Sequence, residues 1–313
     1  IRCFPGDTRP DDWITLPQFA ANEARKILAD FPSPNDRAAW TDRKHQNQLL
    51  LHIQTHHPLV HPEAPPPVLE PSPDRGSKII RIKSESGVII HGQHDPGDSD
   101  KIAILIDVKG YKKVAPHKLA TELRGAGWTV YTLDLRATGE TAHSRDKIGR
   151  AADHNTAEWS LLTGRALLWQ WIWDLRAFLD ASGIQKATII GNGPAGVAAL
   201  CMAAHDKRIT QSATIDSLAS FVSEVPYENQ RLGIMVPSML IELGDIQHIA
   251  ALAAPKPTLV ARGVNGAGKV LTQTELAAEF SFARRVATME NSEFKTMAKA
   301  ASANIVAWLE KNR

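Results

Sequence analysis

The segment Ala-Thr-Ile-Ile-Gly-Asn-Gly-Pro-Ala-Gly, residues 187–196, decides between the folds that this sequence could adopt. An apolar run at 187–190 meets a glycine-rich turn, and an alanine-rich stretch follows at 194–204. This order predicts a strand, a tight turn and a helix. Two classes of site use such a turn, and they require different residues at its centre.

The first interpretation is a dinucleotide-binding turn of the form Gly-x-Gly-x-x-Gly. Gly191, Gly193 and Gly196 would let the backbone approach a pyrophosphate at the helix N-terminus. Asp216, at the end of the next predicted strand, would then bind the ribose. Such a fingerprint usually lies on the first strand of its domain, whereas several predicted strands precede this one. Flavin or nicotinamide binding is therefore kept as an alternative.

The second interpretation is a nucleophile elbow, a strained strand-to-helix turn of the form Gly-x-Ser-x-Gly. Its glycines are needed because larger side chains would not fit beside the turn. The alignment places Gly191 first and Gly193 at the serine position. Since glycine has no side chain, Gly193 cannot act as a nucleophile.

The pattern on both sides of the turn favours the second interpretation. Residues 78–83 alternate and residues 88–90 continue after Gly87, which predicts a hairpin. The apolar run 102–108 predicts a strand buried on both faces. Further strands are predicted at 129–135, 187–190, 209–215, 258–261 and 286–289, and helices at 115–125, 156–182, 194–204, 272–283 and 294–311. Alternating strands and helices predict an α/β protein whose mostly parallel central sheet is covered by helices on both faces. An antiparallel start followed by such units is the plan of the α/β-hydrolase fold.

Composition excludes several classes of protein. The chain has 313 residues, of which 43% are hydrophobic and 22% charged, values typical of a globular protein. No apolar run reaches the ~18 residues of a transmembrane helix, and the net charge of +2 gives no argument for nucleic acid or membrane binding. Two cysteines, Cys3 and Cys201, exclude a disulfide framework and a cysteine-ligated zinc site. The chain begins at Ile1, so a targeting signal would lie outside it.

Three regions are predicted along the chain. Residues 1–56 form an N-terminal helical extension, with helices expected at 13–31 and 36–53. Residues 57–76 form a proline-rich linker, for which an extended path is expected. Residues 77–313 form the α/β-hydrolase-like domain.

Four motifs, in this order, carry a resemblance to a known family. They are Asp-Leu-Arg-Ala-Thr-Gly-Glu-Thr at 134–141, Gly-Arg-Ala-Leu-Leu-Trp-Gln-Trp-Ile-Trp-Asp-Leu-Arg at 164–176, the turn at 191–196 and Ala-Leu-Ala-Ala-Pro-Lys-Pro at 251–257. The chain resembles bacterial α/β-hydrolases of the acetyl xylan esterase group over residues 78–313. Its beginning, at 3–7 and 15–21, resembles the junction of two-domain members. The resemblance implies breakdown of acetylated polysaccharide, a secreted or periplasmic location, and an upstream esterase domain or a glycan as partner.

A serine hydrolase of this fold needs a serine, an acid and a histidine, in that chain order. The serine position holds Gly193. The acid is expected after strand 258–261, where Asn265 is the candidate, and the base after strand 286–289, where Asn291 stands. The last histidine of the chain is His248. We therefore predict a non-catalytic or very weakly active protein; the alternative is a hydrolase that uses groups outside the triad.

The other reactive side chains have structural interpretations, and no cofactor or metal is expected. Ser217 and Ser220 follow the strand after the turn, while the apolar neighbours of Cys201 predict a buried thiol. Metal ligation by His91 and His94 with Asp95, or by His56, His57 and His61 in the linker, is disfavoured, and Asp245 with His248 is expected to cap a helix. The phosphate-loop-like segment 263–270 lacks its final hydroxyl and predicts a glycine turn. Trp169 and Trp173 share a helix face and are expected to pack on the sheet, with sugar stacking as the alternative.

Overall fold

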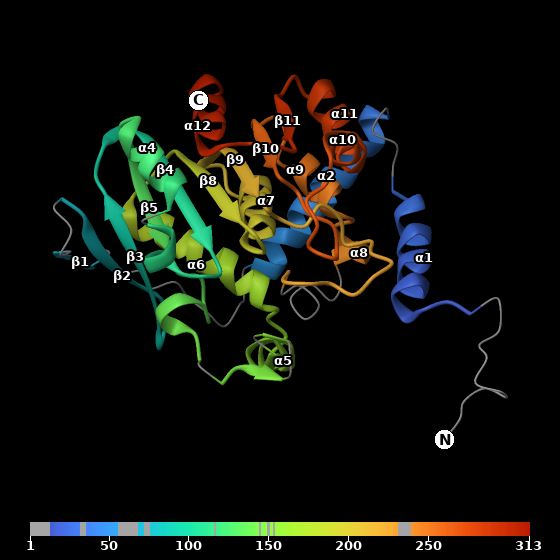
Figure 1. Ribbon diagram of the computed structural model, residues 1–313, viewed down its shortest axis with the longest axis horizontal. Helices are drawn as coiled ribbons and strands as arrows, with labels where there is room; N and C mark the ends of the chain where they lie inside the picture. The colour runs from blue at the N-terminus through green and yellow to red at the C-terminus, as the bar shows by residue number, and fades with distance from the viewer. Residues whose placement is uncertain are drawn as a thin grey trace.

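The computed structural model describes residues 13–31, 36–55, 68–71, 76–115, 117–143, 145–148, 151–152, 154–230 and 239–313. In these residues one sheet contains nine strands in the order β1-β2-β3-β5-β4-β8-β9-β10-β11 (Figure 1). The strands are β1 (Val68–Pro71), β2 (Lys78–Glu85), β3 (Val88–Asp95), β4 (Asp98–Asp107), β5 (Trp128–Leu133), β8 (Ala187–Asn192), β9 (Ile209–Ile215), β10 (Thr258–Ala261) and β11 (Phe294–Met297).

The sheet is antiparallel at one end and parallel through the rest. Strands β1 to β3 pair antiparallel, as do β3 and β5. From β5 onward, the pairs β5–β4, β4–β8, β8–β9, β9–β10 and β10–β11 are all parallel. The carboxyl ends of the parallel strands therefore share one edge of the sheet, where the turn after β8 lies.

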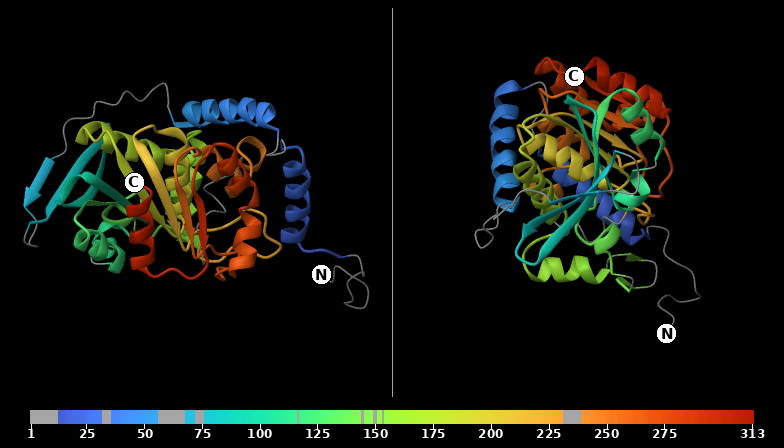
Figure 2. Two further views of the ribbon diagram at one scale, coloured as in Figure 1. Left: turned by 90° about the horizontal axis from the view of Figure 1, so that it is seen from above. Right: turned by 90° about the vertical axis from the view of Figure 1, so that its left-hand side faces the viewer.

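Helices cover both faces of the sheet, which explains why its central strands β5, β8, β9 and β10 are buried along most of their length. Figure 2 shows α2 (Arg37–Thr55) on one side and α4 (Lys118–Gly125) with α12 (Ser302–Lys311) on the other. Helices α6 (Leu167–Ser182) and α7 (Ala195–His205) pack under α2. Each side has its own apolar core, with Trp171 and Phe178 in one and Leu123 and Trp308 in the other.

The remaining elements are shorter and lie around this three-layer body. They are α1 (Leu16–Ala29), α3 (Tyr111–Val114), the 3-10 helix η2 (Gly139–Thr141), the two-stranded sheet of β6 (Lys147–Ile148) and β7 (Ala151–Ala152), α5 (His154–Leu162), α8 (Met239–Glu242), α9 (Ile246–Leu252), α10 (Gln273–Glu279) and α11 (Ser281–Met289). Among the described residues, no helix has the length and apolar character needed to cross a membrane.

The predicted fold class is confirmed, and so are most of its elements. The hairpin is β2 and β3, and the strands predicted at 209–215 and 258–261 have those bounds. The helix predicted at 194–204 is α7. The helix predicted at 115–125 is α4, which begins later, at Lys118, because the side chain of His117 caps its N-terminus; α3 lies before the predicted range.

Two predictions near the middle and the end of the chain are wrong. The helix predicted at 156–182 is broken into α5 and α6, and Gly164 between them has a φ of 71°, which glycine adopts without strain. The strand predicted at 286–289 is the end of helix α11, whose buried residues Phe282 and Val286 recur at helical spacing. The last strand is β11 instead, in the segment predicted as the start of the final helix.

The N-terminal helices lie near their predicted positions, and α2 is part of the main core. Its Trp40 and Leu51 are fully buried in the core cluster that also contains residues of α6 and α7, and the Trp40 ring meets that of Phe282 in α11 with ring centroids 5.3 Å apart. Most of the predicted linker, at 57–67 and 72–75, lies outside the described residues, as do Cys3, His56, His57 and His61. The segment Val68–Pro71 within it is extended, as expected, but pairs with β2 as an edge strand.

Candidate functional site

The turn between β8 and α7 has the geometry of a nucleophile elbow with glycine at its tip. Gly193 has a φ of 55°, and its N–H donates to the carbonyl of Ile215 at 2.8 Å. A Cβ atom at Gly193 would meet nothing within 4 Å. The position that carries the nucleophile in such an elbow is thus open to the solvent side but has no side chain.

The two outer glycines of the turn are required by packing. A Cβ atom at Gly191 would lie 2.5 Å from the carbonyl oxygen of Ala195, and one at Gly196 would lie 2.4 Å from Oγ of Ser217. Close contacts therefore explain both glycines without a pyrophosphate: Gly191 meets the start of α7, and Gly196 meets Ser217, which follows β9. Asp216, the ribose-binding candidate, forms an ion pair with Arg262.

The amide donors expected around an elbow are also altered. An oxyanion hole in this fold uses the N–H of the residue after the nucleophile and an N–H from the loop after the strand here called β4. The residue after Gly193 is Pro194, which has no N–H. In the loop after β4, Lys109 N–H donates to Oδ1 of Asp107 at 2.8 Å and Tyr111 N–H to Oδ1 of Asp134 at 2.7 Å. The loss of this N–H can be read from the sequence, because proline never has one, but it was not among the predictions for the site.

The base position follows β11, in residues 298–301, which read Ala-Lys-Ala-Ala and contain no histidine. The assignment of Asn291 to this position is wrong because it depended on the misplaced strand. Asn291 lies before β11, close to Glu293, whose carbonyl accepts from Thr258 N–H at the start of β10. That is the opposite edge of the sheet from the elbow.

The acid candidate, Asn265, follows β10 as predicted but is used within its own turn. Its side-chain oxygen accepts from Lys269 N–H at 3.0 Å, and its own N–H donates to the carbonyl of Lys269 at 3.0 Å. These bonds close the glycine-rich segment 263–270 into a turn, in line with the prediction for it. Asn265 borders a separate cavity of about 240 Å³, which also contains Ser220 and Glu279.

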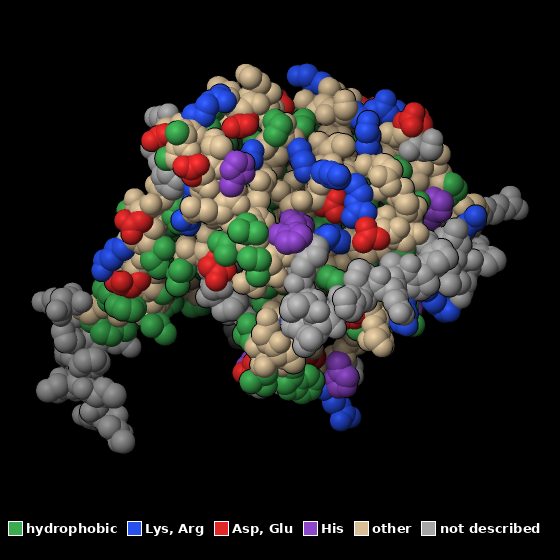
Figure 3. Space-filling view, turned by 180° about the vertical axis from the view of Figure 1, so that it is seen from behind, with side chains coloured by type: hydrophobic (Ala, Val, Ile, Leu, Met, Phe, Trp, Pro, Cys, Tyr) green, Lys and Arg blue, Asp and Glu red, His purple; other side chains and the backbone are tan. Residues whose placement is uncertain are grey.

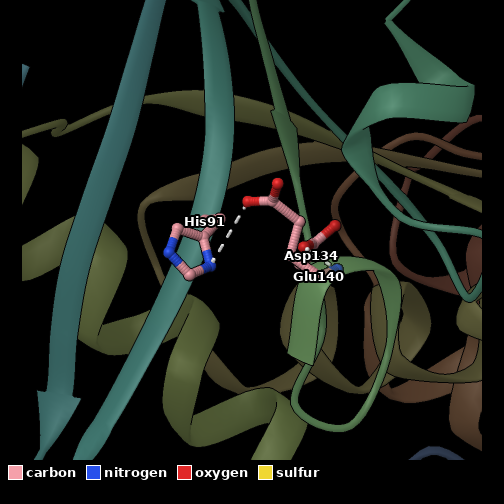
Figure 4. Close-up of side chains that lie close together, drawn as sticks. All are labelled: His91, Asp134 and Glu140. Carbon is pink, nitrogen blue, oxygen red and sulfur yellow. Dashed lines mark hydrogen bonds and ion pairs between the residues drawn. The ribbon is translucent and has the colours of Figure 1, made fainter. Parts of the chain in front are cut away.

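A cluster of His91, Asp134 and Glu140 lies beside the loop after β5, with ligand atoms within 4.8 Å of one another (Figure 4). Both Asp134 oxygens accept main-chain donors, from Tyr111 N–H at 2.7 Å and Glu140 N–H at 2.9 Å. Burial raises the pKa of Asp134, whereas the hydrogen bond from Lys112 lowers the pKa of Glu140. The carboxylates are thus already satisfied by amides and an ammonium, so the cluster holds two loops together and is poorly suited to a cation.

Arg136, in the same motif, is the centre of a buried ion network. Its guanidinium binds both oxygens of Asp174, at 2.6 and 3.2 Å, and also contacts Glu85. Arg165 binds Glu85 at 3.0 Å. The motif residues 134–141 and 164–176 therefore meet in space and fix the loop after β5 against α6. Glu140, at the end of the first motif, pairs with Lys112.

The other candidate nucleophiles and bases have structural roles. Burial raises the pKa of the Cys201 thiol, and Ser217 is buried against Gly196. Ser220 donates to Asp245 at 2.5 Å, and Asp245 caps α9. Nδ1 of His248 accepts from Asp245 N–H at 3.1 Å, and burial lowers the pKa of His248 to about 4.

The remaining aromatic and histidine candidates are also accounted for by packing. Trp169 and Trp173 are 7% and 5% exposed, so they are core residues and sugar stacking on them is excluded. His94 stacks on Tyr131 with ring centroids 4.6 Å apart, and Asp95 pairs with Arg124 at 2.7 Å.

Strand order, parallel register and the β8–α7 elbow define this chain as a protein of the α/β-hydrolase fold. Solved structures similar to it include a protein from Bacteroides fragilis assigned as an acetyl xylan esterase, at 16% identity and a TM-score of 0.65, covering 94% of this chain and 83% of that chain. An acetyl xylan esterase from Thermoanaerobacterium matches at 11% identity and a TM-score of 0.53, covering 93% and 96%.

A family 15 glucuronoyl esterase from Caldicellulosiruptor kristjansonii matches at 15% identity and a TM-score of 0.52, covering 84% of this chain and 83% of that chain. At such identities the likeness shows the fold, and at that level it agrees with the resemblance found in the sequence. No protein-family model matches the chain, and comparison with curated protein sequences finds no match.

Proposed function

We propose that this chain is an esterase-like α/β-hydrolase-fold protein that does not hydrolyse esters at its elbow. The observation that carries the proposal is Gly193, which has the backbone conformation of the nucleophile position and no nucleophile. Support comes from Pro194, which cannot donate to an oxyanion, and from the loop at 298–301, which has no imidazole. Loss of the serine or the histidine alone costs about as much rate as loss of the whole triad, and the residual rate depends on the oxyanion hole and on substrate binding.

The role we infer instead is binding. The names of the similar structures point to esters of carbohydrates, so a carbohydrate or a companion esterase domain is the partner class that we propose. The buried network around Arg136 and the packing of Gly191 and Gly196 keep the elbow in place without chemistry. Retained architecture at a position without reactive groups is what a binding domain requires.

Hydrolysis of p-nitrophenyl acetate and release of acetate from acetylated xylan test the proposal. At micromolar protein, the folded chain should give no more product than an equal amount of heat-unfolded chain. A Ser220→Ala variant and a Ser217→Ala variant serve as matched controls, because these two serines follow β9, the strand that pairs with β8. Turnover by the wild type would contradict the proposal in either of two cases. If one of the two variants abolishes it, the substituted serine is the nucleophile. If the wild type and both variants all turn over substrate, another group of the chain is active.

A further inference from the structure

A cavity of about 470 Å³ lies at the carboxyl ends of β4, β8 and β9, next to the elbow. Leu105, Ile190 and Ile215 form part of its lining and are buried, so the inner wall is apolar. Small-molecule sites have volumes of roughly 300–1,000 Å³. In open α/β sheets ligands bind outside the carboxyl ends of the strands. Both the size and the place of the cavity therefore suit a small ligand.

The exposed part of the cavity lining is basic. Lys109, Lys113 and Lys118 come from the segment after β4, and Arg262 comes from the end of β10. Arg262 pairs with Asp216, and Lys118 lies 3.7 Å from Glu122. Among the residues that the structure describes, no acidic group forms an ion pair with Lys109 or Lys113. Ammonium groups that share one cavity repel each other, and an anion between them relieves that repulsion.

The one carboxylate in the lining is already engaged. Oδ2 of Asp107 accepts from the Asn192 amide at 2.6 Å, and Oδ1 accepts from Lys109 N–H at 2.8 Å. On the opposite wall α12 begins at Ser302 after Ala301, whose methyl group cannot accept a hydrogen bond from the first amides of the helix. The positive end of that helix adds to the basic character of the cavity.

The basic character is local to the cavity. On the face that α2 covers, Figure 3 shows lysine and arginine side chains lying among aspartate and glutamate. Arg208 forms two ion pairs, with Asp206 at 2.7 Å and with Asp180 at 2.5 Å, so its charge is balanced. A general excess of positive charge therefore does not explain the cluster, in agreement with the net charge of +2.

We propose that this cavity binds a small organic anion. Its carboxylate or phosphate group is held by Lys109 and Lys113, and its body lies against the apolar wall formed by Leu105, Ile190 and Ile215. This goes beyond the proposed loss of hydrolysis and does not depend on it, because binding is measured without turnover.

Isothermal titration calorimetry at low ionic strength tests the proposal with three sugars that differ only at C6: glucose, glucuronate and glucose 6-phosphate. One or both anions should bind, and glucose should not. A Lys109→Met, Lys113→Met variant should bind the anion at least about tenfold more weakly, since the two ammonium groups proposed to hold its charged group are removed. A Lys207→Met variant, with one charge lost at the other edge of the sheet, should bind as the wild type does.

Each outcome is informative. Binding of glucuronate alone assigns a carboxylate ligand, and binding of glucose 6-phosphate alone assigns a phosphate ligand. A Lys113→Gln variant should show an intermediate loss and replaces the double variant if that one fails to fold by its thermal melt. Absence of binding by both anions, equal binding of glucose, or unchanged affinity in the folded lysine variants would overturn the proposal.

Discussion

Serine substitutions at Gly193 and Gly191 should separate backbone strain from packing in the elbow. At Gly193 the left-handed φ of 55° costs a non-glycine residue about 1 kcal/mol, and its Cβ meets no atom within 4 Å. At Gly191 a Cβ would lie 2.5 Å from the carbonyl oxygen of Ala195 and 2.6 Å from Cα of Gly196, so the backbone of α7 must shift. We expect Gly191→Ser to cost about 3 kcal/mol or more.

Urea unfolding followed by tryptophan fluorescence measures both losses, with the free energy taken by linear extrapolation. The Gly193→Ser variant should lose the smaller amount and should still gain no esterase activity, because Pro194 offers no N–H and residues 298–301 offer no base. Equal losses for the two variants would refute the assigned geometry of the turn. Esterase activity in the Gly193→Ser single variant would show that the missing N–H at Pro194 and the missing base in residues 298–301 do not prevent catalysis.

Three further predictions follow from buried groups. The pKa of His248 is about 4 in the folded chain and ~6.5 in the unfolded chain, so its contribution to the free energy of unfolding is full above pH 6.5 and falls by about 3 kcal/mol in total as the pH drops through 4. Urea unfolding of a His248→Gln variant should lack this part of the pH dependence. The same pH dependence in the variant and the wild type would contradict the prediction. Arg136→Met should cost about 3–5 kcal/mol, because Asp174 is left buried without its partner; a loss below about 1 kcal/mol would argue against the network. Because burial raises the pKa of the Cys201 thiol, iodoacetamide should alkylate it only in urea, as peptide mass spectrometry would show, and native labelling would contradict its burial.

Periodicity predicted the central sheet well because its strands are covered on both faces. The run at 102–108 and the strand at 258–261 are mostly apolar for that reason, whereas β9 at 209–215 is buried although it contains Gln211, Ser212 and Thr214. The last strand, β11, reads Phe-Lys-Thr-Met and is only partly buried, so no apolar run marks it. Helix α11, just before it, carries the apolar spacing that was taken for a strand. That error displaced the base position to Asn291.

The candidate site was only partly predictable. Gly193 and the missing histidine are visible in the sequence because the elbow is a local motif with a fixed position after its strand. Pro194 was equally visible, since proline never has an N–H. The basic cavity was not visible, because it brings Lys109 and Lys113 beside Arg262 only through the neighbouring positions of β4, β8, β9 and β10 in the sheet. Contacts over such distances in sequence depend on topology and leave no local pattern.

Reaction with a fluorophosphonate tests the central claim most directly, since this reagent modifies hydroxyl nucleophiles that an adjacent base activates. Intact mass spectrometry of the folded chain after prolonged exposure measures the number of adducts. We expect the unmodified mass, because Gly193 has no hydroxyl and no imidazole lies in the loop after β11. A stoichiometric adduct on any serine of the folded chain would contradict this expectation if the same serine is not modified when the chain is unfolded before the reagent is added.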